Sequence, residues 1–85
     1  MTLMPVTTLV ERELQVTNVA DDLDLNKVVE QVGDVEANEV STNAFIAYVM
    51  KLYDATIEFA RDLIYFFIEL GKLVLTARYT LQPVA

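Results

Sequence analysis

Residues 43–77, NAFIAYVMKLYDATIEFARDLIYFFIELGKLVLTA, contain most of the large apolar side chains of this chain. If the segment forms one helix, with about 100° of rotation per residue, apolar side chains occupy most of the helix circumference. A narrow arc of roughly 100° remains for the charged residues, which we call the polar stripe. The stripe consists of Lys51, Asp54, Glu58, Arg61, Asp62, Glu69 and Lys72. We therefore predict a mostly α fold with one long amphipathic C-terminal helix over about 42–78.

The apolar face of this predicted helix is too wide for a short neighbour to cover. Half a dozen large side chains left in water cost on the order of 10 kcal/mol, at about 1.5 to 3 kcal/mol each, which rivals the stability of a small domain. Polar positions also recur every seven residues, a spacing typical of helices that pack against other helices. We predict an oligomer interface made of Phe45, Tyr48, Phe59, Leu63, Phe66, Phe67, Leu70 and Val74.

The charge is divided unevenly along the 85 residues. Residues 1–40 contain nine acidic and two basic side chains, which gives the whole net charge of −7, while residues 41–85 contain four of each and are neutral. We therefore divide the chain into an acidic N-terminal region, 1–40, and an oligomerisation region, 41–85. Because nucleic-acid binding depends on basic side chains that contact phosphate, this balance argues against nucleic acid as a direct partner.

Within the acidic region, a short amphipathic helix is predicted over about 20–32. Its apolar residues recur with a spacing of three and four, and they are Leu25, Val28, Val29 and Val32. Asn18 or Asp22 is placed to cap the first turn, and Gly33 follows the end of the pattern. Residues 34–40 then form a connector to the long helix.

The remaining segments are predicted as extended arms. Residues 1–17 mix strand-favouring Thr and Val with helix-favouring Glu and Leu, so strand and helix both stay open there. Ser41, Thr42 or Asn43 is placed to cap the long helix. After that helix, residues 79–85 favour an extended tail, because Thr80 and Leu81 suit a strand and Pro83 excludes a helix.

The side-chain chemistry argues against catalysis. The sequence has no His and no Cys, and its one Ser is at the predicted start of a helix, so the usual nucleophile and base pairs cannot be built. No haem or metal ligand set accompanies the aromatic residues, and we predict no catalytic, cofactor-binding or metal-binding residues. We expect a noncatalytic structural subunit that self-associates into a ring, tube or filament, as in a virion or an ejection or secretion channel, alone or within a larger protein assembly.

Two alternatives come from other classes of protein. One is an oligomeric membrane-active or channel-forming protein, in which the polar stripe lines a lumen and the apolar face meets lipid. A single-pass monomer is disfavoured, because Glu69 and Lys72 interrupt the apolar run and central charges cost about 2.5 to 3.5 kcal/mol each. The other is a regulatory partner that offers its helix to a groove on a larger protein. The first residues lack a basic and apolar signal, so we expect synthesis in the cytoplasm without a signal peptide.

Overall fold

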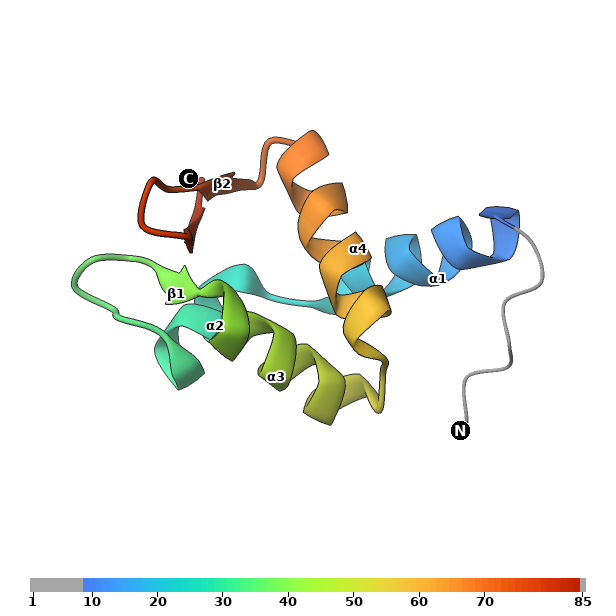
Figure 1. Cartoon of the computed structure of the whole chain (residues 1–85), viewed down its shortest axis with the longest axis horizontal. Helices are drawn as coiled ribbons and strands as arrows, with labels where there is room; N and C mark the ends of the chain where they lie inside the picture. Colours follow the sequence, from blue (N-terminus) through green and yellow to red (C-terminus); the bar gives the residue numbers. More distant parts are fainter. Residues whose placement is uncertain (1–8, 85) are drawn as a thin grey trace.

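The computed structural model describes the backbone of residues 9–84 and the side chains of residues 14–84. These residues form four helices and a small antiparallel sheet, in the order α1 (Leu9–Asp22), α2 (Leu25–Val32), β1 (Val40–Ser41), α3 (Thr42–Tyr53), α4 (Ile57–Glu69), β2 (Leu73–Leu75) and β3 (Thr80–Pro83). Figure 1 shows their arrangement. The mostly α character agrees with the sequence, but the predicted architecture of one long helix with extended arms is wrong.

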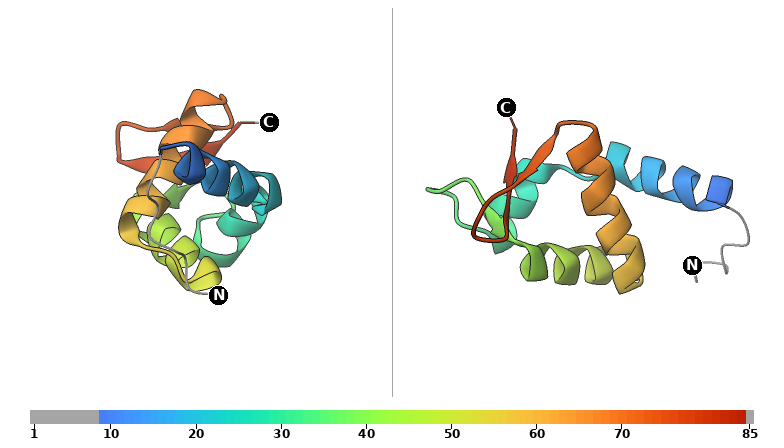
Figure 2. Two further views of the ribbon diagram at one scale, coloured as in Figure 1. Left: turned by 90° about the vertical axis from the view of Figure 1, so that its right-hand side faces the viewer. Right: turned by 45° about the horizontal axis from the view of Figure 1, so that its top comes forward.

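The predicted helix over 42–78 is broken after Tyr53. Asp54 adopts the left-handed conformation with φ of 51°, and Asp is one of the few non-glycine residues that tolerate it. Thr56 then starts α4, where its hydroxyl oxygen accepts a 3.1 Å hydrogen bond from the amide of Phe59. A side-chain cap of this kind satisfies an amide that the first helical turn leaves unpaired. The turn at 54–56 therefore directs α4 away from the line of α3 instead of extending that helix (Figure 2).

The predicted extended tail is also wrong, because it forms the central strand of a sheet. Gly71, with φ of 73°, lies in the turn between α4 and β2. Strand β3 pairs antiparallel with both β1 and β2, so the strand order is β1-β3-β2. Leu81 lies opposite Val40 on one side and Leu75 on the other. The sheet thus joins residues about 40 positions apart in the sequence, and the two predicted regions share one fold.

The predicted helix over 20–32 is wrong in its first half. Leu23 and Asp24 separate α1 from α2, and Asp24 caps α2 instead of Asn18 or Asp22. The Asp24 carboxylate accepts hydrogen bonds from the amides of Asn26, at 3.0 Å, and Lys27, at 3.4 Å. The predicted end at Val32, followed by Gly33, is confirmed. Residues 9–17, left open between strand and helix, are helical, and the N-terminal arm before residue 9 lies outside the described residues.

The core draws side chains from every helix and strand. Its fully covered members include Phe45 of α3, Leu63 and Phe67 of α4, Leu73 of β2 and Leu81 of β3. Helix α1 packs on α4 and extends past it, as Figures 1 and 2 show. Helix α4 contacts α1, α3 and β2, so the chain covers much of the wide apolar face by itself.

Candidate protein-interaction surfaces

The eight residues predicted as an oligomer interface fall into three groups. Phe45, Phe59, Leu63 and Phe67 are buried in the chain's own core, with exposed fractions of 6% or less. Tyr48 and Phe66 are half-buried and pack against that core. Leu70 and Val74 are about half exposed. Half of the predicted interface is therefore covered without a partner, because the break at Asp54 lets α3 and α4 bury each other.

The residues of the predicted polar stripe do not form one continuous line. Lys51 is on α3, Asp54 is in the turn, and Lys72 follows the end of α4. The other four are on α4, where Glu58, Arg61 and Glu69 are exposed and Asp62 is half-buried. Each side chain except Asp62 keeps the solvent exposure that the sequence suggests, but the bend separates the stripe into two short rows.

One ionisable group outside the stripe has a clearly changed environment. Burial, together with a 2.8 Å hydrogen bond from its hydroxyl to the Asp22 carboxylate, raises the pKa of Tyr53 to about 12. This contact ties the end of α3 to the end of α1. A phenol that stays protonated to such high pH cannot act as a base near neutrality, so the contact has a structural character.

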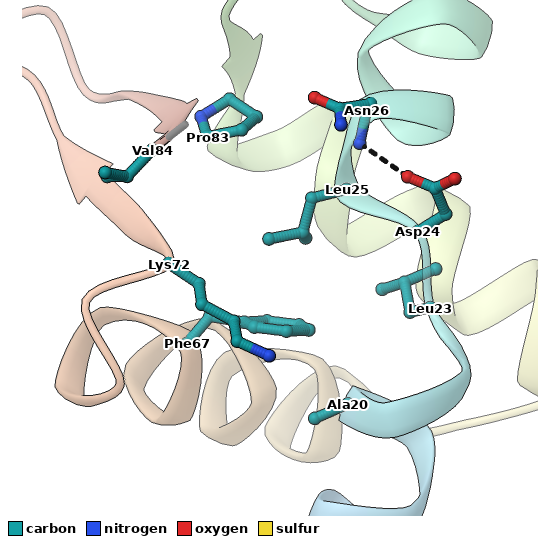
Figure 3. A pocket seen from close by; sticks show the side chains of 9 residues that line it. All are labelled: Ala20, Leu23, Asp24, Leu25, Asn26, Phe67, Lys72, Pro83 and Val84. Carbon is teal, nitrogen blue, oxygen red and sulfur yellow. Dashed lines mark hydrogen bonds between the residues drawn. The ribbon is translucent and has the colours of Figure 1, made fainter.

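A hollow of about 290 Å³ lies between the α1–α2 junction, α4 and the end of β3 (Figure 3). Lys72 supplies its amine and Asp24 its carboxylate, while Leu23, Leu25 and Phe67 make much of the wall. The Asp24 carboxylate is already engaged as the cap of α2. In the described residues, moreover, no group of three or more acidic side chains could hold a metal ion. The hollow therefore offers one cation among apolar side chains and no acid–base pair.

Helices α3 and α4 and their three-residue turn have the form of a helix-turn-helix, with the β2–β3 hairpin behind them. In DNA-binding versions the second helix enters the major groove. The exposed side chains of α4 include two carboxylates, Glu58 and Glu69, against one cation, Arg61. Arg78 of the hairpin forms a 2.8 Å ion pair with Glu39, which neutralises it. The surface that would face DNA thus has little positive charge.

An apolar groove of about 720 Å³ lies between α2 and α3, and we call it the α2–α3 groove. Its lining consists of Gln31, Val32, Ala44, Ala47, Tyr48, Lys51 and Leu52. Leu52 is 53% exposed and Val32 is 40% exposed, so large apolar side chains meet solvent at its rim. Of these residues the sequence prediction named Tyr48 for the interface and Lys51 for the stripe, and it missed the others.

A sequence signal for this groove was present. Of the four helices in the described part of the chain, α3 is the one whose residues include no carboxylate. In a chain with a net charge of −7, an acid-free helix stands out from its surroundings. One continuous helix over 42–78 would join these residues to the carboxylates of α4, and the acid-free segment is then no longer distinct.

Among the residues that the structure describes, no helix has the length and apolar character needed to cross a membrane. Searches of protein-family models, curated proteins and solved structures find no match for this chain. Functional inference therefore rests on the surfaces described above.

Proposed function

We propose that this chain is a noncatalytic assembly subunit that associates with copies of itself through apolar side chains left exposed on the folded surface. The α2–α3 groove is the observation that carries the proposal. It combines exposed Leu52 and Val32 with the small side chains of Ala44 and Ala47. Exposed apolar surface that is concave and has few charges is typical of protein-binding sites.

The noncatalytic part of the proposal rests on side-chain chemistry. The sequence contains no His and no Cys, and Ser41 uses its hydroxyl oxygen to accept a 3.1 Å hydrogen bond from the amide of Ala44, as the cap of α3. The phenol of Tyr53 is held protonated by its surroundings. The chain therefore lacks the residues that usually form an activated nucleophile and its base.

A protein partner is favoured over nucleic acid by the sign of the charge. Contacts to phosphate need Lys or Arg side chains, and the exposed face of α4 has more carboxylates than cations. The exposed apolar side chains of the α2–α3 groove favour a protein partner that covers them. A small subunit of a virion, or of an ejection or secretion apparatus, is the setting we propose for such a chain.

The test is the mass of the purified protein in detergent-free solution, measured by light scattering over a range of concentrations. We expect a mass above the 9.6 kDa of one chain, rising with concentration toward a defined multiple. A mass of one chain at every concentration would refute self-association. Circular dichroism on the same samples verifies that the protein is folded.

A further inference from the structure

We infer that the α2–α3 groove receives helix α3 of a second copy, so that two chains form a two-fold symmetric, antiparallel pair. The inference rests on the proposed function and adds the surface, the partner and the symmetry. In such a pair, the same patch serves both chains, and each contact occurs twice. The surface must therefore be complementary to itself.

The shape of the groove meets this requirement. Leu52 is at one end of α3, with 53% of its surface exposed, whereas the small side chains of Ala44 and Ala47 leave a hollow toward the other end. Ala44 and Leu52 are eight residues apart, which is about 12 Å along a helix. When two α3 helices lie antiparallel, Leu52 of each chain meets the small side chains of the other. One arrangement thus fills the hollow in both chains.

The charge distribution selects a second copy as the occupant. Residues 14–84 contain eleven carboxylates and five basic side chains, a net charge of −6, so most approaches between two copies are repulsive. Helix α3 contains no carboxylate, and its single charged residue is Lys51 at the groove. Two copies that meet along α3 bring together the helix that contains no carboxylate in each chain.

This arrangement predicts how salt affects the association. An interface held by ion pairs weakens as salt screens the attraction, but here the long-range force between two acidic chains is repulsive. Screening should therefore strengthen the pair. The contact of one helix and its groove is also small beside a standard interface of about 800 Å² per partner, so we expect a reversible dimer that dissociates on dilution.

The experiment compares Leu52→Asp with Val74→Asp by light scattering and sedimentation. The two residues are matched, because Val74 is 49% exposed on β2, outside the groove, and the change in charge is the same. We expect Leu52→Asp to raise the dimer Kd about 100-fold or more, since two leucines are removed per dimer and each tenfold corresponds to 1.4 kcal/mol. Val74→Asp should leave the Kd within a few-fold of the wild-type value.

The outcomes separate this inference from the proposed function. A wild-type oligomer that Leu52→Asp does not weaken, or that Val74→Asp weakens equally, overturns the α3 pair and leaves self-association standing. A wild-type chain that stays monomeric overturns both. Circular dichroism verifies the fold of each variant, and Ala47→Arg provides a second probe, because it fills the hollow while Leu52 stays unchanged in sequence. An Ala47→Arg dimer as tight as wild type also contradicts the pair.

Discussion

Replacing Phe67 with Ala distinguishes a core residue from an interface residue. Phe67 is 1% exposed and packs within the chain's own core, although the sequence pattern placed it at an oligomer interface. Truncation of a fully buried Phe costs about 3 to 5 kcal/mol, from lost burial and from the cavity that remains. A domain of this size has a stability of about 4 to 13 kcal/mol. Phe67→Ala therefore removes a large part of the free energy of unfolding.

The assay is thermal unfolding followed by circular dichroism, at concentrations low enough to keep the chain monomeric. We expect the melting temperature to fall by more than about 12 °C, at about 4 to 8 °C per kcal/mol. Phe66→Ala is the matched control, because Phe66 is the adjacent residue and its ring is only half-buried. We expect it to lose roughly half as much stability as Phe67→Ala. The reasoning fails if Phe67→Ala unfolds within about 0.5 kcal/mol of the wild type, or if its loss of stability disappears on dilution.

Three further predictions concern turns, a cap and the half-buried phenol of Tyr53. Gly33→Ala should destabilise the fold by about 1 to 3 kcal/mol, because the added carbon would lie 2.6 Å from the carbonyl oxygen of Glu39. Gly71→Ala meets no neighbour and should cost about 1 kcal/mol through its φ of 73°, and Gly71→Asn should cost less. A loss as large for Gly71→Asn as for Gly71→Ala would contradict the backbone explanation. Asp24→Ala should lose about 1 kcal/mol with the cap of α2, whereas Asp24→Asn should retain most of it, as thermal melting can show. Because the folded chain raises the pKa of Tyr53 from 10.0 to about 12, its contribution to stability is present below pH 10 and disappears between pH 10 and 12. Ultraviolet titration should show one late-ionising tyrosine that Tyr53→Phe removes.

Local sequence signals predicted parts of the fold where one short segment decides the structure. Ser41 was among the expected caps of the helix that follows it, and it accepts the amide of Ala44 at 3.1 Å. The end of α2 at Val32 was also predicted, as were Val28 and Val29 on its inner face, both of which are buried. Caps and apolar periodicity depend on neighbours within a few residues, so one sequence contains what is needed to find them.

The break in the predicted helix is hard to detect in the sequence because the apolar periodicity is a stronger signal than the capping residues. The triplet at 54–56 combines Asp, which tolerates a left-handed conformation, with Thr, a favoured cap. Both signals are weak alone, and the apolar pattern continues through them. The energy that decides comes from burial, since the break lets α4 fold onto α3 and cover Phe45, Leu63 and Phe67 within one chain.

The sheet lay beyond sequence reasoning for a different reason. The strand preference of residues near Thr80 and Leu81 was recognised, but a strand needs partners. Its partners are β2, a few residues earlier, and the two-residue β1, about 40 residues earlier. A segment as short as Val40–Ser41 gives no periodic signal, so the pairing that turns a tail into the central strand has no mark in the sequence.

The most direct test of the α3 pair is disulfide trapping with the double variant Ala44→Cys and Leu52→Cys. The natural chain has no Cys, so every disulfide comes from the two new thiols. Within one chain they are about 12 Å apart along α3, too far for a bridge, which needs α-carbons within about 7 Å. In a two-fold antiparallel pair, the new thiol at position 52 of each chain lies beside the new thiol at position 44 of the other chain. Mild oxidation should therefore yield a covalent dimer of twice 9.6 kDa, while Val74→Cys should stay monomeric. No covalent dimer, or equal dimer from both proteins, would contradict the account.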